Sequence, residues 1–149
     1  MCRIAIFPGS FDPFTIGHDS VVRRALPLFD KIIIGVGVNA DKKPLFTVEK
    51  RVEFIKSLYE KEPRIEVLAY DTLTIAFAQK VHANYILRGL RSVRDFEYER
   101  EQADINRQLS GVETVLLFSE PHLSSISSTM VRELQHFGVD VSAYLPSKS

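Results

Sequence analysis

The sequence predicts an α/β fold in which five parallel strands form one sheet with helices on both of its faces. Short apolar runs alternate with amphipathic segments along the whole chain. The runs at 4–7 and 31–38 are almost continuously apolar, which is typical of strands that are buried on both sides. We therefore expect one doubly wound, Rossmann-like domain spanning residues 1–149, a length that suits a single domain.

The composition is that of an ordinary globular protein, with 45% hydrophobic and 26% charged residues and a formal net charge of zero. A balanced charge gives no reason to expect a nucleic-acid or membrane partner. No apolar run approaches the roughly 20 residues needed to cross a bilayer, and the chain enters a strand without a signal-like segment. With Cys2 as its one cysteine, no internal disulfide is expected, so we predict a cytoplasmic protein.

The first strand is expected at Ile4–Phe7, and Pro8 and Gly9 end it. A polar loop then leads to Gly17 and His18, where an amphipathic helix begins. A strand that runs through a tight loop into a helix directs backbone N–H groups and a positive dipole end at one point. Gly17 has no Cβ to obstruct a nucleotide, and His18 can donate a ring N–H to a phosphate.

The other elements follow in order: strands at 31–38, 64–69, 85–87 and 112–118, and helices after Thr47 and at 73–81, 93–109 and 127–137. We expect Leu73 and Phe137 to face the core from their helices. Ligands of such sheets bind at the carboxyl ends of the strands. The candidate site therefore lies in the loops that follow the strands: 10–18, 39–43, 70–74, 88–94 and 119–129.

Basic residues follow two of these strands. Either Lys42 or Lys43 can reach into the site and neutralise a phosphate, although two lysines in a loop are often simply solvated. Arg88, Arg91 and Arg94 are spaced three apart, and arginine suits bidentate binding of phosphate oxygens. Nearby acidic residues leave open that part of this cluster forms structural ion pairs.

The run 124–129 is rich in hydroxyl groups and precedes the last helix. One serine is enough to cap a helix, but the whole run with its N–H groups also suits a second phosphate cradle. The sequence has no dinucleotide fingerprint, P-loop or nucleophile motif. It also has no carboxylate cluster, so we expect no protein metal ligands, and a Mg²⁺ carried mainly by substrate phosphates.

The segment Thr15-Ile16-Gly17-His18 resembles the T/H-x-G-H signature of the nucleotidyltransferase superfamily. Over nearly its whole length the chain resembles bacterial phosphopantetheine adenylyltransferases, through PGSFDPFTIGH at 8–18, KKPLFT at 42–47, ILRGLRSVRDFEYE at 86–99 and ISST at 126–129. This resemblance implies Mg²⁺-dependent transfer of AMP from ATP to 4′-phosphopantetheine, giving dephospho-coenzyme A and pyrophosphate. It also implies a homohexamer and feedback binding of coenzyme A.

The resemblance assigns roles by position, with His18 stabilising the transition state and Lys42 and Arg91 assisting catalysis. It places the acceptor substrate at Ser10, Lys42, Thr74 and Arg88. It places ATP at Ser10, Phe11, His18, Gly89, Leu90, Arg91, Glu99, Leu123, Ser124, Ser125, Ile126, Ser127, Ser128 and Thr129.

Two other functions stay open at the level of the sequence. A nicotinamide or nicotinate mononucleotide adenylyltransferase shares the first and last of the four segments, but the segment at 86–99 argues against it. A nucleotide-binding regulatory module without catalysis is the other alternative. The joint presence of His18, the lysines and the arginines argues against that one.

Overall fold

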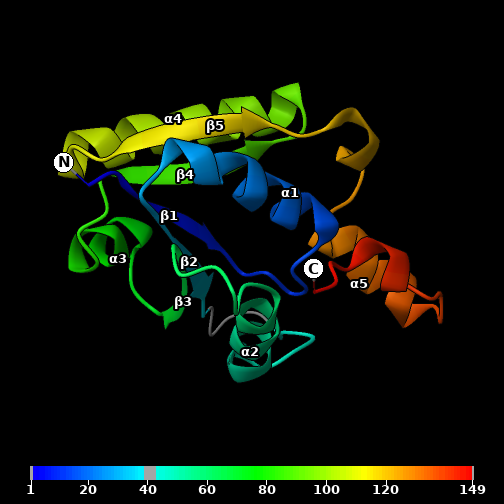
Figure 1. Cartoon of the computed structure of the whole chain (residues 1–149). Coiled ribbons are helices and arrows are strands. Elements are labelled where there is room, and N and C mark those ends of the chain that lie inside the picture. Colours follow the sequence, from blue (N-terminus) through cyan, green and yellow to red (C-terminus); the bar gives the residue numbers. More distant parts are fainter. Residues whose placement is uncertain (1, 39–42, 149) are drawn as a thin grey trace.

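The computed structural model describes residues 2–38 and 43–148. Its centre is a five-stranded sheet with the strand order β3-β2-β1-β4-β5, and every pair of neighbouring strands is parallel (Figure 1). The strands are β1 (Ile4–Gly9), β2 (Lys31–Gly37), β3 (Ile65–Tyr70), β4 (Tyr85–Leu90) and β5 (Glu113–Phe118). The order reverses next to β1, so the topology confirms the doubly wound parallel sheet that the sequence predicts.

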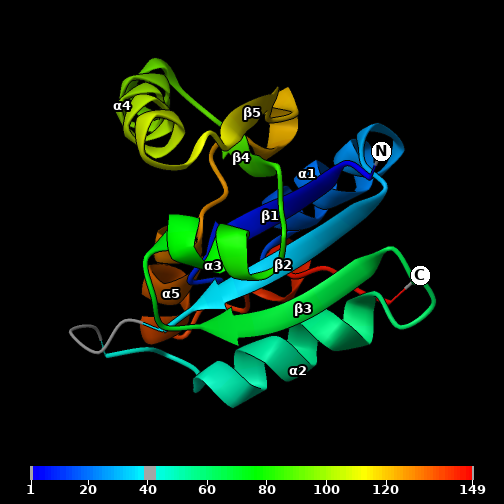
Figure 2. The ribbon, with the colours of Figure 1, turned by 90° about the vertical axis from the view of Figure 1, so that its left-hand side faces the viewer.

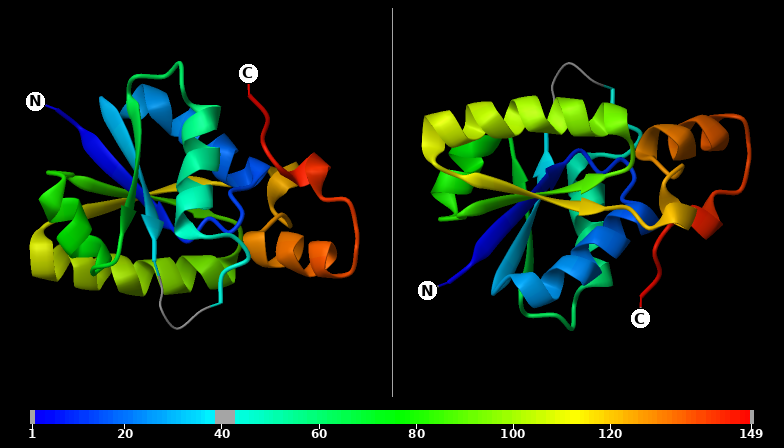
Figure 3. Two further views of the ribbon diagram at one scale, coloured as in Figure 1. Left: turned by 90° about the horizontal axis from the view of Figure 1, so that it is seen from below. Right: turned by 90° about the horizontal axis from the view of Figure 1, so that it is seen from above.

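The helices are α1 (Ile16–Ala25), α2 (Val48–Leu58), α3 (Thr74–Lys80), α4 (Val93–Ser110) and α5 (Ser128–His136), with short 3-10 segments at Leu26–Leu28, Pro121–Leu123 and Ser142–Tyr144. Helices α1 and α2 pack on one face of the sheet, and α3 and α4 lie on the other (Figure 2). Helix α5 lies beyond the carboxyl ends of the strands (Figure 3). Among the described residues, no helix combines the length and the hydrophobicity needed to cross a membrane.

The pleat of the central strands divides the core into two apolar clusters. Ala5 and Phe7 of β1 point toward α1 and α2, where Ile34 of β2 joins them. Ile6, between them in β1, points to the opposite face and packs in one cluster with Phe77 of α3. Because successive strand residues alternate between the two faces, a sheet covered on both sides needs the unbroken apolar runs seen in the sequence.

Side-chain caps fix where the helices begin. The hydroxyl groups of Thr15, Thr47, Ser92 and Ser127 each accept a hydrogen bond from a backbone N–H in the first turn of the helix that follows. Such caps satisfy N–H groups that have no partner inside the helix. The prediction that Thr47 caps its helix is therefore confirmed.

Three expectations for the elements are corrected. Strand β4 extends to Leu90, beyond the predicted end at residue 87, so Arg88 belongs to the strand. Leu73 and Phe137, expected in the core, are 74% and 76% exposed. Both flank their helices as cap residues, and the inward positions are taken by Phe77 in α3 and by Val131 in α5.

Candidate active site

A cavity of about 590 Å³ opens at the carboxyl ends of β1 and β4. We call it the nucleotide cavity. Its walls are the β1–α1 loop, the first turn of α1, the end of β4, the start of α4 and the start of α5. Its lining includes Ser10, Phe11, Thr15, Gly17, His18, Arg88, Gly89, Arg91, Arg94, Glu99, Leu123, Ile126, Ser127, Ser128 and Thr129. Two helix N-termini therefore border one cavity, an arrangement that favours phosphate groups.

The ring of His18 is fixed by the turn that begins α1. The backbone N–H of Thr15 donates to Nδ1 of His18 at 2.9 Å, and the Thr15 hydroxyl lies 3.2 Å from the same nitrogen. Phe11 and Phe14 pack on the ring with centroid separations of 5.0 and 5.3 Å. The capping residue of the helix thus also orients the imidazole that lines the cavity.

These contacts decide the protonation state of His18. A backbone N–H can only donate, so Nδ1 accepts and the ring proton is on Nε2. Burial, aided by the positive charges of Arg88 and Arg91, lowers the pKa of His18 from 6.5 to about 3. At neutral pH the side chain is therefore an uncharged imidazole that offers one N–H donor.

Arg88 is tied to Glu99 by a partly buried ion pair. Its Nε and Nη2 donate to the Glu99 carboxylate at 2.8–3.1 Å, and its Nη1 donates to the Pro8 carbonyl at 2.8 Å. A guanidinium has five N–H donors, and these contacts leave one on each Nη for a ligand. The side chain of Glu99 is only 8% exposed, so its charge depends on Arg88 for compensation.

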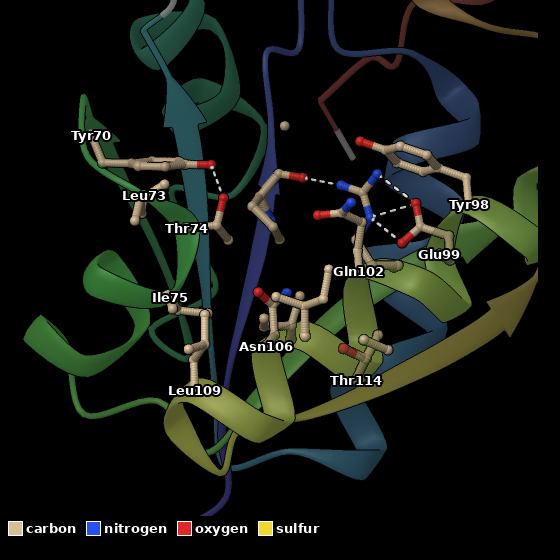
Figure 4. Close-up of a pocket in the computed structure, with 16 residues that line it drawn as sticks. Tyr70, Leu73, Thr74, Ile75, Tyr98, Glu99, Gln102, Asn106, Leu109 and Thr114 are labelled. Atoms are coloured by element: carbon tan, nitrogen blue, oxygen red, sulfur yellow. Dashed lines mark hydrogen bonds and ion pairs between the residues drawn. The ribbon is translucent and has the colours of Figure 1, made fainter.

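A second cavity of about 320 Å³ lies between α3 and α4, and we call it the arm cavity (Figure 4). On one side Tyr70 and Thr74 face it, with their hydroxyl oxygens 3.2 Å apart. Side chains of α4, among them Gln102 and Asn106, face it from the other side. The two cavities share the following lining residues: Pro8, Gly9, Arg88, Tyr98 and Glu99. The cavities therefore adjoin one another, and Arg88 lies where they meet.

Three buried or partly buried polar side chains that the sequence analysis did not assign hold the loops around this site. Asp12 accepts the N–H groups of Leu45 and Phe46 at 2.7 and 2.9 Å. Arg51 donates to the carbonyl of Ser10 at 2.6 Å. Arg132 of α5 donates to the carbonyl of Asp12 at 2.7 Å, and the Ser128 hydroxyl donates to the carbonyl of Pro13. Their bonds span 33 to 120 positions of chain, so no local pattern in the sequence indicates them.

With this geometry established, comparison with known proteins gives the family. Residues 6–134 match the family model described as cytidylyltransferase-like. The phosphopantetheine adenylyltransferase of Phocaeicola vulgatus is 60% identical over 144 residues, covering 97% of this chain and 95% of that protein. The protein of the same name from Bacteroides thetaiotaomicron is 59% identical over the same length. The chain belongs to the phosphopantetheine adenylyltransferase family.

Solved structures agree on the fold. A bifunctional NMN adenylyltransferase/ADP ribose pyrophosphatase from Francisella tularensis, solved with AMP and a manganese ion, superimposes with a TM-score of 0.72. The match covers 100% of this chain and 46% of that protein, at 18% identity. At such low identity the likeness concerns the fold alone. The sheet and helices are thus those of the adenylyltransferases to which the sequence similarity points.

For a phosphopantetheine adenylyltransferase, most of the predicted ATP contacts lie together in the nucleotide cavity. The exceptions are Leu90, Ser124 and Ser125, which are absent from its lining. Among the predicted acceptor contacts, Thr74 lies in the arm cavity and Arg88 at its junction with the nucleotide cavity. Lys42 lies outside the described residues. Lys43 lines a smaller cavity next to Ser10 and Arg51. The roles of these residues stay predictions.

Gly17 occupies a position that the protein fold alone does not reserve for glycine. A Cβ added there would lie 3.4 Å from the Thr15 hydroxyl and 3.7 Å from the Ile126 carbonyl, both ordinary contacts. By contrast, a Cβ on Gly35 would lie 2.6 Å from the Phe77 ring. The lack of a side chain at Gly17 therefore matters for what occupies the cavity more than for packing.

Within the part of the chain that the structure describes, no group of three or more His, Cys, Asp or Glu side chains could hold a metal ion. Asp12 lies close to the β1–α1 loop, but its two oxygens already accept the Leu45 and Phe46 N–H groups. A divalent ion in this site would therefore take most of its ligands from substrate phosphates and water, which suits Mg²⁺.

Proposed function

We propose that this protein transfers AMP from ATP to 4′-phosphopantetheine, forming dephospho-coenzyme A and pyrophosphate. The observation that carries the proposal is the pair of adjoining cavities with Arg88 at their junction. ATP would occupy the nucleotide cavity, and the pantetheine chain would occupy the arm cavity. The acceptor phosphate would then lie at Arg88, beside the α-phosphate of ATP. Family membership supports the same reaction.

On the nucleotide side, the chemistry is stabilisation of negative charge. The Nε2–H of His18 is available to donate to an oxygen of the α-phosphate, where charge builds up as the acceptor attacks. Arg91 has an exposed side chain with a long contact of 3.6 Å to Asp95, so it is available to a phosphate. The N-terminus of α5 adds backbone donors for the outer phosphates of ATP.

On the acceptor side, positioning is the main contribution. The two N–H donors of Arg88 that Glu99 and Pro8 leave unused would hold the acceptor phosphate in line with the α-phosphorus. Lys42 would add charge to the same phosphate, as its position in the family pattern implies. The phosphate itself is the nucleophile, so the reaction forms one P–O bond to the acceptor and breaks the bond to pyrophosphate in a single displacement.

Mg²⁺ would act in this site as a counter-ion of the triphosphate. It neutralises phosphate charge and assists departure of pyrophosphate when it is bound. No carboxylate cluster among the described residues competes for it. We expect the metal to enter and leave with the nucleotide.

The test is a pyrophosphate-release assay with ATP and Mg²⁺, in which 4′-phosphopantetheine and nicotinamide mononucleotide are offered separately. Release with phosphopantetheine alone, together with the mass of dephospho-coenzyme A, is the expected result. Release with the mononucleotide alone would overturn the choice of acceptor. Silence with both acceptors, in protein that still binds ATP, would instead favour a regulatory module.

We also propose that the protein assembles as a homohexamer. Large apolar side chains lie exposed along α4 and at the end of β5, among them Val93 at 78%, Leu109 at 67% and Phe118 at 74%. Apolar surface gathered on neighbouring elements is typical of an interface. Light scattering after gel filtration tests the assembly, and a monomer at micromolar concentration would contradict it.

Coenzyme A is the expected feedback ligand. It carries both an adenine nucleotide and a pantetheine arm, so it would occupy both cavities and compete with both substrates. Inhibition that is competitive against ATP and against 4′-phosphopantetheine is the expected kinetic pattern. Inhibition that neither substrate relieves would contradict it.

A further inference from the structure

Arg51 of α2 is a buried cation that the proposed reaction does not use. Its residue is only 6% exposed. Its guanidinium donates from Nε to the Phe46 carbonyl at 3.1 Å, and from Nη1 to the carbonyls of Ser10 at 2.6 Å and Gly37 at 3.4 Å. All of these partners are carbonyl oxygens, and no carboxylate among the described residues forms an ion pair with it. Removing a charge from water without a counter-ion is costly, so this side chain needs a specific reason to be there.

The three carbonyls belong to three different segments. Ser10 lies in the β1–α1 loop, Gly37 ends β2, and Phe46 precedes the cap of α2. Arginine suits this task because its planar fork reaches acceptors in several directions, whereas a lysine ammonium on a flexible stem does not present the same fixed geometry. One side chain therefore fixes the β1–α1 loop against both ends of the connection between β2 and α2.

Asp12 completes this connection from the opposite direction. Its carboxylate accepts the N–H groups of Leu45 and Phe46, so the peptide of Phe46 is bound at its N–H by Asp12 and at its carbonyl by Arg51. Asp12 is also only 6% exposed. We call Asp12 and Arg51 together the loop brace.

The brace borders the acceptor side more closely than the ATP side. Lys43 and Ser10 line a cavity of about 190 Å³ together with both brace residues. In contrast, the nucleotide cavity shares only Ser10 with that lining. A shift of the 43–46 segment would therefore move cationic side chains near the acceptor and leave most of the nucleotide cavity in place.

We propose that Arg51, with Asp12, is a positioning residue that sets the 43–46 segment and the Ser10 carbonyl in register for capture of the acceptor phosphate. The inference rests on the proposed function, since it concerns the acceptor of that reaction. It predicts a separation of effects: loss of the brace raises the KM of the acceptor and leaves the affinity for ATP nearly unchanged.

The test compares Arg51→Gln with the matched control Tyr59→Phe. Tyr59 also joins α2 to α1 through a buried hydrogen bond, from its hydroxyl to Asp19 at 2.6 Å, but it touches neither loop of the brace. For Arg51→Gln we expect an acceptor KM raised about 10-fold or more, with the ATP Kd changed by less than about 3-fold. Tyr59→Phe should lower the melting temperature without changing either constant.

Two further variants keep the test decisive. Arg51→Lys retains the charge but loses the fork, so it should resemble Arg51→Gln; full activity in Arg51→Lys would overturn the geometric role. Asp12→Asn keeps the size of the side chain and should raise the acceptor KM in the same way if Arg51 variants fail to fold. An Arg51→Gln protein that only melts earlier, or that loses ATP and acceptor affinity equally, also overturns the proposal.

Amide hydrogen exchange gives a readout that does not depend on turnover. The Leu45 and Phe46 amides donate to Asp12 and should exchange faster in Arg51→Gln than in Tyr59→Phe, measured with the full chain. Unchanged exchange at these amides would overturn the brace. If the wild-type protein fails to adenylylate 4′-phosphopantetheine, the proposed function fails, and the exchange rates still decide on the brace.

Discussion

The nucleotide cavity and the arm cavity are built in different ways. The nucleotide cavity is bordered by two helix N-termini and by a loop whose backbone is held by Asp12, Arg51, Arg132 and Ser128. The arm cavity is lined mainly by side chains from α3 and α4, with the Tyr70–Thr74 contact as a polar feature. Backbone-lined sites depend on the chain path, whereas side-chain-lined sites depend on residue identity.

This difference explains what each cavity tolerates. A change in the nucleotide cavity alters the position of groups that stabilise a transition state, so its effect on turnover should be large. A change in the arm cavity alters contacts that hold the acceptor equally before and during reaction, so it should act mainly on KM. The predictions below test this division.

The largest effect is expected from His18→Ala. Loss of one donor to the developing charge should lower kcat about 10²–10³-fold, as for other preorganised donors of this kind. The ATP Kd, measured by calorimetry without acceptor, should change by only a few-fold, because the other lining residues remain. A loss of ATP affinity as large as the loss of turnover would make His18 a binding residue instead.

Gly17→Ala should separate activity from stability. The added Cβ makes ordinary contacts inside the protein, so the melting temperature should be unchanged or slightly higher. The same methyl group extends toward the nucleotide and should lower kcat/KM for ATP by about 10²-fold. Gly35→Ala, where the Cβ meets an aromatic ring, serves as the opposite control and should lose stability. Full activity of Gly17→Ala would mean that the nucleotide does not approach this turn.

Arg88→Met should destabilise the fold as well as impair acceptor binding. It leaves the Glu99 carboxylate buried without its partner, a change that typically costs about 3–5 kcal/mol. Adding Glu99→Gln should restore much of the free energy of unfolding, measured in denaturant, but not the activity. Equal stability of the single and double variants would show that the pair is not coupled.

A smaller effect is expected from Thr74→Val in the arm cavity. The substitution keeps the shape of the side chain and removes the hydroxyl that lies 3.2 Å from the Tyr70 hydroxyl. A single neutral hydrogen bond contributes about 0.5–1.5 kcal/mol, so the acceptor KM should rise by about 2–10-fold. The ATP Kd and kcat should stay the same; a fall in kcat at unchanged KM would place Thr74 in the chemistry.

The smallest expected effect is the absence of a titration. Because burial and the two arginines lower the pKa of His18 to about 3, its imidazole is neutral from pH 5 to 9. A profile of kcat/KM against pH should therefore show no inflection near 6.5 that His18→Gln removes. An inflection that disappears in this variant would contradict the neutral state.

The same lowered pKa of His18 has a consequence for stability. The unfolded chain takes up a proton on His18 below pH 6.5, whereas the folded chain does so only near pH 3. His18 therefore makes the folded state less stable as the pH falls from 6.5 toward 3. Denaturant titrations at several pH values should give a shallower acid dependence for His18→Gln than for the wild type.

The sequence predicted the parts of the structure that repeat or that follow local rules. Unbroken apolar runs identified the buried strands, and Thr47 identified a helix start. The loops after the strands converge on the site because parallel strands end at one edge. The end of β4 was missed, since Arg88 and Gly89 are poor strand formers whose place depends on pairing with β5.

The sequence could not reveal the bonds that hold the site in shape. Asp12 and Arg51 act on backbone groups far along the chain, and their partners become visible only once the fold is known. Glu99 was assigned to ATP, and the structure shows it bound to Arg88. The core positions of α3 and α5 were misjudged at Leu73 and Phe137, because helical periodicity does not say where a short helix ends.

The central claim is that the acceptor phosphate attacks ATP directly while His18 donates a hydrogen bond. With Nδ1 accepting from Thr15, Nε2 carries the proton and has no free lone pair with which to attack phosphorus. The stereochemical course at the α-phosphorus, followed with ATP that carries one sulfur on that phosphorus, tests this most directly. We predict inversion, the outcome of one in-line displacement. Retention would require two displacements and an AMP–protein intermediate, and would contradict the account.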